Sequence, residues 1–268
     1  MKDLSKDFLL KDEGSVEDFL GVRITNKRTK HFHEIHLQQT GLINDVLTEL
    51  DIDGPTARHE RHDIPSNEVL LSDPDGKPFQ AKWSYRSIIG KLNFLAQNTR
   101  PDIAYAVHQC AKFSADPKLS HQIAVKRIGR YLKTTADKGL ILRPDGTHQL
   151  NAYSDSDFAG NWSRNLAHMR NSHYSRAGCV ITYSGCPIHW FNRLETEIAL
   201  STCKAEYIAL SMSCRSLIPL QCILEELYAT FEIPLDATHT EITNHLGCSV
   251  VLEDNSAALA LTNDGDKF

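Results

Sequence analysis

The order of apolar and polar positions predicts strands first and helices afterwards in the first half of the chain. Residues 16–26 are apolar and β-branched and are typical of a strand, with Gly21 as a bulge. A second strand is predicted over residues 31–39. Over residues 40–50 the apolar positions recur at helical spacing, and Thr40 is a plausible N-cap. The chain therefore begins with two strands and an amphipathic helix.

A long break and three further helices follow. Residues 51–82 contain four prolines, several Asp residues and two Asp-Gly signals, which favours an irregular connection. Helical periodicity returns over residues 83–98, then from Pro101 onward, where proline suits a first turn, and again over residues 121–135. Residues 139–150 contain a Pro-Asp-Gly signal that predicts a hairpin. We place a domain boundary near residue 143.

The second half of the chain has a different character. Strands are predicted over residues 150–155, 177–184 and 187–192, and a long helix over 201–229 with an interruption near Pro219. An apolar strand at 248–254 and a short helix complete the pattern. Three strands, a helix, a strand and a helix together predict an α/β domain, in which a mixed sheet is covered by helices.

Composition narrows the possible functions. Apolar residues make up 41% of the 268 residues and the net charge is −5, values typical of a globular protein. No run of 18 apolar residues occurs, so we expect no membrane span, and the charged N-terminus predicts no signal peptide. Neither a P-loop nor a GxGxxG motif is present, which argues against a nucleotide cofactor. The net charge does not favour nucleic-acid binding, although a local basic stripe could still provide it.

Three acids stand at the ends or beginnings of these predicted elements. Asp155 ends the first strand of the second half, Glu206 lies on the first turns of the long helix, and Asp254 ends the last strand. If the two strands are neighbours and the helix crosses them, the carboxylates converge. Such a cluster favours Mg²⁺ or Mn²⁺ as a cofactor. The alternative is that the aspartates are turn residues and that Glu206 is solvated, and spacing alone leaves both interpretations open.

Several motifs in fixed order resemble the ribonuclease H domain of copia-type retrotransposon Pol polyproteins. They read YSDSDFAGNW, GCVITYSGCPIHW, TEIALSTCKAEYIALS and LEDNSAALAL. The resemblance implies a ribonuclease H-like fold and two-metal hydrolysis of the RNA strand of an RNA–DNA hybrid. By position Asp155, Glu206 and Asp254 match the metal-binding acids of the family, and Asp157 matches a second acid of the first motif.

The upstream segments resemble the C-terminal, thumb- or connection-like part of the reverse transcriptase in the same polyproteins. They include EDFLGVRI, YRSIIGKLNFLAQNTRPDIAYAVHQCAKFS and AVKRIGRYLKTT. The implied domains are a mainly helical region at 1–143 and a ribonuclease H-like domain at 144–268. The implied partners are an RNA–DNA hybrid or RNA and the remainder of the Pol polyprotein, in a cytoplasmic virus-like particle and without a membrane.

The helix over 121–135 is the strongest nucleic-acid candidate outside the acids. Its predicted buried stripe is apolar, and its other face is basic, with Lys126, Arg127, Arg130 and Lys133. Such a face would bind backbone phosphates without reading bases. The alternative is an ordinary solvated helix face, and the sequence does not separate the two.

Some family features are missing from this chain. No Asp-Asp pair occurs, so we predict no polymerase activity. The family has a fourth acid beyond the last helix, for which Asp264 and Asp266 are poor substitutes, so we expect a C-terminally truncated domain with impaired hydrolysis. Lys204 stands where a glutamate would complete a capping box with Ser201. Two other hypotheses remain: a non-catalytic nucleic-acid-binding remnant, and a degenerate relic without activity.

Overall fold

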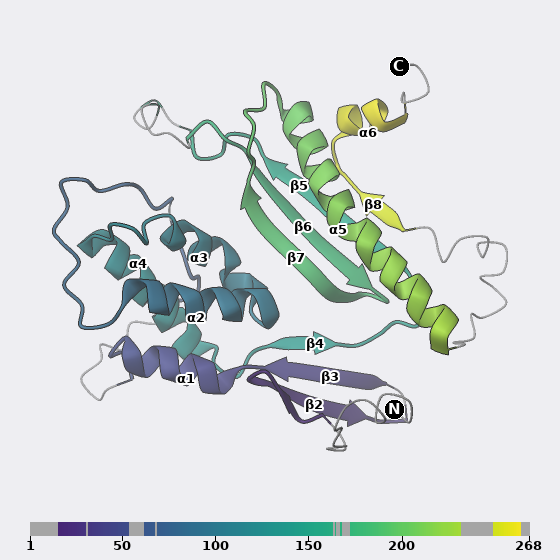
Figure 1. The fold of residues 1–268 in the computed structure, drawn as a ribbon, viewed down its shortest axis with the longest axis horizontal. Helices are drawn as coiled ribbons and strands as arrows, with labels where there is room; N and C mark the ends of the chain where they lie inside the picture. The colour runs from purple at the N-terminus through teal and green to yellow at the C-terminus, as the bar shows by residue number, and fades with distance from the viewer. Residues whose placement is uncertain are drawn as a thin grey trace, which may run out of the picture.

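The chain forms two four-stranded sheets and a group of helices. A computed structural model describes residues 16–30, 32–53, 62–67, 69–162, 164, 167, 172–231 and 249–263. This part of the chain contains six α-helices and the two sheets (Figure 1). The predicted α/β class is therefore confirmed.

The first sheet comes from the N-terminal region and one later strand. Its strands are β1 (Asp18–Phe19), β2 (Val22–Arg28), β3 (His33–Gln38) and β4 (Leu140–Leu142). They lie in the order β1-β2-β3-β4, and every neighbouring pair is antiparallel. The predicted bulge at Gly21 is wrong: Gly21 has a φ of 76° and lies in the turn between β1 and β2. Glycine reaches this left-handed region without a Cβ clash.

A helical core packs beside this sheet. Its helices are α1 (Thr40–Glu49), α2 (Tyr85–Asn98), α3 (Ala104–Ala111) and α4 (Leu119–Thr134), with the 3₁₀ helix η2 (Pro101–Ile103) before α3. The predicted apolar stripes meet in one buried cluster that includes Ile43, Leu92 and Leu132. Burial of such stripes gives most of the stability of helices this short.

Two helix starts differ from the prediction. The residue before α1 is Gln39, with no side-chain cap, and Thr40 is already helical, with its hydroxyl donating to the Ala136 carbonyl at 3.3 Å. Thr40 is therefore not the N-cap. Pro101 opens a 3₁₀ turn, and the α-helix begins three residues later at Ala104. Proline has no N–H and its φ is fixed, so it suits either kind of first turn.

The second sheet carries most of the C-terminal half. Its strands are β5 (Leu150–Asp157), β6 (Arg176–Tyr183), β7 (Cys186–Leu194) and β8 (Val250–Leu252), in the order β7-β6-β5-β8. β7, β6 and β5 are antiparallel, and β8 joins the other edge of β5 in parallel. The predicted mixed sheet is thus confirmed. The short helix α6 (Ser256–Asn263) follows β8.

Helix α5 (Thr202–Phe231) crosses one face of this sheet (Figure 1). A small core that includes Ala152, Ile181 and Leu217 joins the helix to the strands. The predicted interruption is wrong, because the helix continues through Pro219. Proline removes one hydrogen bond, to the carbonyl of Arg215, and packing of the helix on the sheet outweighs this loss.

Among the described residues α5 is also the one helix long and apolar enough to cross a membrane. This finding rests on length and composition alone, which core helices of water-soluble proteins can share. α5 lies against β5 and β6 and carries the buried carboxylate of Glu206. It forms the layer that covers the sheet.

The link between the two sheets runs through the Pro-Asp-Gly segment. The predicted hairpin there is wrong, because β4 pairs with β3 of the first sheet and β5 pairs with β6 and β8 of the second. The two halves also touch through α2 and β7, where the Trp190 indole donates to the Ala96 carbonyl at 2.8 Å. The boundary near residue 143 falls between β4 and β5 and stays a prediction.

Candidate metal centre

Strand β5 places the first acid. Its residues alternate between buried and more exposed positions, with Ser154 and Ser156 buried on the side of α5 and Asp155 and Asp157 on the other face. Ser213 of α5 donates to the Ser154 hydroxyl at 3.2 Å, which fixes this orientation. The two aspartates share a face because side chains in a strand alternate with a period of two.

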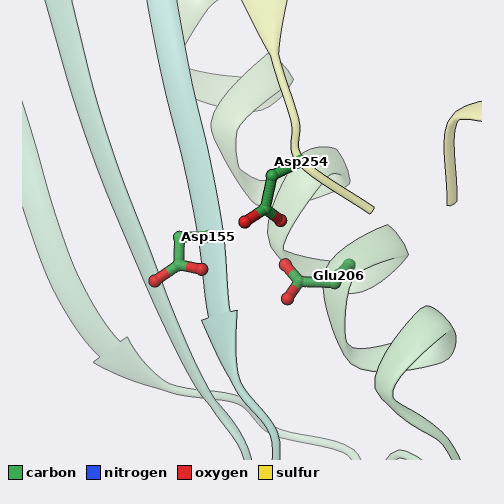
Figure 2. A group of neighbouring side chains, drawn as sticks. All are labelled: Asp155, Glu206 and Asp254. Carbon is green, nitrogen blue, oxygen red and sulfur yellow. The ribbon is translucent and has the colours of Figure 1, made fainter. Parts of the chain in front are cut away.

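The short partner strand leaves the end of β5 open. β8 pairs only with Asn151, Ala152 and Tyr153 of β5. Within the part of the chain that the structure describes, no strand therefore lies against the edge of β5 beside Asp155 on this side. A side chain from above the sheet can reach around this edge to the exposed face. The chain that leaves β8 also passes this opening and brings Asp254 to it (Figure 2).

The start of α5 places the second acid. The Ser201 hydroxyl accepts a hydrogen bond from the Lys204 N–H at 3.1 Å, so Ser201 is the N-cap, as predicted. Glu206 follows on the first turns and is 7% exposed. A hydrogen bond from the Ser156 backbone helps to orient its carboxylate toward the open edge of β5.

The three predicted acids meet at this edge. One carboxylate oxygen each from Asp155, Glu206 and Asp254 lies within 4.8 Å of the other two. Figure 2 shows the carboxylates of Glu206 and Asp254 turned toward each other, with Asp155 beside them on β5. The structure thus meets the condition set from the sequence, that the two strands are neighbours and the helix crosses them. Their role as metal ligands stays a prediction.

Negative charge dominates the electrostatics of this cluster among the described residues. Burial, together with the carboxylates of Glu253, Asp155 and Asp254, raises the pKa of Glu206 to about 7. The Oε2 atom of Glu206 is buried and has no hydrogen-bond partner among the residues that the structure describes. A buried anionic oxygen without a partner is costly, and a divalent cation would satisfy it. The oxygen donors present therefore fit Mg²⁺ or Mn²⁺.

Asp157 is not a member of this group. It lies opposite Arg176 in the register of β5 and β6, and its negative charge acts on that guanidinium. Its carboxylate also lies so close to Gly160 that a Cβ there would collide with it. The structure thus places Asp157 toward the following turn and toward Arg176, and gives no support to a role in metal binding.

Sequence reasoning missed Glu253. Burial, with the negative charges of Asp254 and Asp155, raises the pKa of Glu253, and its carboxylate interacts with that of Glu206. The signal in the sequence was its position next to Asp254. A strand through both residues would have put them on opposite faces. The proposed substitutes for a further acid, Asp264 and Asp266, lie outside the described residues.

The basic face of α4 is only partly as predicted. Lys133 is exposed, but Lys126, Arg127 and Arg130 are half-buried. The Arg127 guanidinium donates to the Asn67 side chain at 2.5 Å, and the Lys133 ammonium donates to the Ile52 carbonyl at 2.8 Å. These two side chains bind the connection around α4 itself. Nucleic-acid binding by this face stays a prediction.

Comparison with known proteins identifies the family. The chain is 33% identical over 231 residues to the retrovirus-related Pol polyprotein of transposon TNT 1-94 from Nicotiana tabacum, which covers 84% of this chain. It is 32% identical over 213 residues to the Pol polyprotein of transposon RE1 from Arabidopsis thaliana, which covers 77% of the chain. These matches span 16% and 13% of the two polyproteins, so the chain corresponds to a small part of each.

A shorter relative matches along most of its own length. An uncharacterized mitochondrial protein of Arabidopsis thaliana is 31% identical over 218 residues, which are 80% of this chain and 82% of that protein. No protein-family profile matches the chain, and no solved structure matches it. The chain belongs to the retrovirus-related Pol polyproteins of copia-type retrotransposons, as a segment of such a polyprotein.

Proposed function

We propose that the second sheet and α5 form a ribonuclease H-type domain that hydrolyses the RNA strand of an RNA–DNA hybrid. The observation that carries this proposal is the convergence of Asp155, Glu206 and Asp254 within 4.8 Å. Each acid comes from a different element, so the arrangement depends on the tertiary fold. Acidic side chains are almost never fully buried unless they are paired, and Glu206 is 7% exposed.

The topology supports the same proposal. Three antiparallel strands, a crossing helix and a fourth strand parallel to the first match the order expected from the motifs. The acids lie at the end of β5, near the start of α5 and just after β8. Membership in the Pol polyproteins makes a nucleic acid the natural substrate class, with the remainder of the polyprotein as its context.

Each of the three acids would have its own role in binding the cations. Asp155 and Asp254 supply exposed carboxylates for divalent cations, and Glu206 supplies the buried one, which is held by the Ser156 backbone. Bound Mg²⁺ ions would activate a water molecule and stabilise the leaving oxygen of the phosphodiester. Asp155 lies on the open face of β5, so a nucleic-acid backbone can approach the centre from that side. No Asp-Asp pair is present in the chain, so polymerase activity is not proposed.

Single-turnover cleavage tests the proposal. The chain is mixed in excess with a hybrid that carries a 5′-labelled RNA strand, with Mg²⁺, Mn²⁺ or EDTA. We expect slow, metal-dependent cleavage of RNA in the hybrid and none of the same RNA in a duplex with RNA. Asp155→Asn is expected to lower the rate at least a hundredfold.

The matched control is Asp116→Asn, which removes an exposed aspartate, 79% accessible, from the loop before α4. It is expected to cleave at the wild-type rate. Equal cleavage by the wild type and Asp155→Asn would mean a contaminating nuclease and would overturn the proposal. Absence of cleavage by the wild type with either metal would overturn it as well.

A further inference from the structure

We propose that a cleft in the helical region binds a small amphiphile, a molecule with one oxyanion head group on a short aliphatic chain. The cleft lies between α3, α4 and the connection at residues 62–67 and 69–70, and its volume is about 430 Å³ (Figure 1). A cleft of this size holds a small molecule. Asp155, Glu206 and Asp254 are not among its lining residues, so this site is separate from the proposed metal centre.

The first observation is an unpaired donor on α3. Gln109 lines the cleft and is 0% exposed. The Lys112 ammonium donates to Oε1 of Gln109, and an ammonium group can only donate, so this contact fixes which end of the amide is the oxygen. Nε2 is the other end, and it has no acceptor among the residues that the structure describes. A buried amide N–H without an acceptor is costly, so the site favours a ligand that supplies one.

The second observation is an unpaired donor on α4. Arg127 lines the same cleft, and its Nη2 donates to the Asn67 side chain, but its buried Nε has no acceptor within the described part of the chain. Both unpaired groups are donors, so neither can satisfy the other. Arg130 adds a second guanidinium, and the described lining contains no Asp or Glu. An ionised carboxylate or phosphate is the complementary head group, because its oxygens only accept and its charge is negative.

The third observation is the apolar remainder of the walls. Aliphatic side chains come from the connection, from α3 and from α4: Val69, Leu70, Ala106, Ile123, Ala124 and Ile128. Ile128 is 1% exposed and lies deep, whereas Ile123 is 58% exposed and lies at the rim. The described lining contains no Phe, Tyr or Trp on which a nucleobase would stack. An aliphatic chain therefore fits these walls better than a base does.

Methyl NMR of the full chain tests the inference. The isoleucine methyl groups are labelled with ¹³C, and octanoate is titrated into the sample. We expect saturable shift changes at Ile123 and Ile128, and none at Ile181 in the core of the second sheet. The dissociation constant is expected to be about 1 mM or lower. 1-Octanol lacks the charge and acetate lacks the chain, so each is expected to bind at least about tenfold more weakly.

Variants of the lining separate specific binding from adsorption to apolar surface. Arg127→Met removes a guanidinium at similar length, and Ile123→Asp puts a negative charge on the exposed rim. Each is expected to weaken octanoate binding at least about tenfold. Gln109→Glu keeps an acceptor for Lys112 but replaces the unpaired donor with an oxygen, and is expected to abolish binding. Arg215→Met, which changes an exposed arginine of α5, is the matched control and is expected to bind like the wild type.

A parallel titration with octyl phosphate identifies the head group. Saturable binding of either amphiphile at Ile123 and Ile128 supports the site, and the tighter one shows whether carboxylate or phosphate is preferred. The inference is wrong if neither amphiphile shifts these methyl groups, or if octanoate and 1-octanol bind equally well. Unchanged binding in either Arg127→Met or Ile123→Asp would also overturn it, and these two variants decide the matter if a thermal melt shows that Gln109→Glu does not fold. Cleavage of the hybrid is a separate measurement, so either proposal can fail without the other.

Discussion

Arg176 of β6 donates from Nη1 to Nδ1 of His108 in α3, with 3.2 Å between the nitrogens. The same Nη1 donates to the Asn192 side chain at 2.7 Å, and the guanidinium lies over the Tyr105 ring. His108 must keep Nδ1 free of a proton to accept this bond, which fixes the neutral tautomer. The contact joins the helical region to the sheet that carries the metal centre.

This contact predicts a loss of stability in acid. Burial and the positive charges of Arg176 and Lys112 lower the pKa of His108 to about 4. The unfolded chain takes up a proton near pH 6.5 and the folded chain does not, so the free energy of unfolding falls between pH 6.5 and 4, by up to about 3 kcal/mol. Glutamine at position 108 accepts from Arg176 without titrating. Urea unfolding at pH 7.5 and 4.5 is expected to show a smaller loss for His108→Gln than for the wild type, and equal losses would contradict this account.

The carboxyl group of Glu206 predicts the opposite pH dependence of stability over nearly the same pH range. Its pKa of about 7 lies above the ordinary value of 4.5, so its neutral form favours folding below pH 4.5 and this contribution is lost as the pH rises through 7. At pH 8 the free energy of unfolding of Glu206→Gln is expected to exceed that of the wild type by up to about 3 kcal/mol. Near pH 4 the two free energies are expected to be similar.

Added Mg²⁺ provides the control for this prediction. It is expected to stabilise the wild type at pH 8 and to affect Glu206→Gln much less, because a cation offsets the repulsion that the variant reduces. Chemical denaturation of both proteins, with and without added Mg²⁺, measures this difference in the free energy of unfolding. If Glu206→Gln gains no stability at pH 8, burial and the neighbouring carboxylates do not destabilise the charged form of Glu206.

The N-terminus of α5 offers a third prediction. The Ser201 cap is formed, but Lys204 places a positive charge at the positive end of the helix and cannot accept from the Ser201 N–H. Lys204→Glu is expected to raise the free energy of unfolding by about 1 kcal/mol. Lys204→Gln supplies the acceptor without the charge and is expected to give a smaller gain. Thermal or urea unfolding of the wild type and the two variants measures these differences. No gain in stability in either variant would show that the capping box does not form.

The positions of Asp155 and Glu206 could be predicted because they depend on local features. Alternation along β5 and the cap at Ser201 set the directions of Asp155 and Glu206, and both are visible in the sequence. Glu253 could not be predicted in the same way. Its direction depends on β8 ending at Leu252, which is set by how few residues pair with β5.

Other differences have the same long-range cause. Pro219 predicts a break by local rules, and packing of α5 along the sheet keeps the helix continuous. The bond between Arg176 and His108 joins residues that are 68 positions apart. Neither periodicity nor motif spacing reports such a contact. Elements with strong periodicity, such as α2 and α4, were therefore predicted well, and the ends and contacts of elements were not.

The central claim is that the carboxylates of Asp155, Glu206 and Asp254 hold a divalent cation. The most direct measurement is an anomalous difference map from crystals of the chain soaked in Mn²⁺, with data collected at the manganese absorption edge. The account predicts a peak among these three side chains. Crystals of the Asp155→Asn variant provide the control, with this peak weakened. A map without a peak at the three carboxylates would contradict the account.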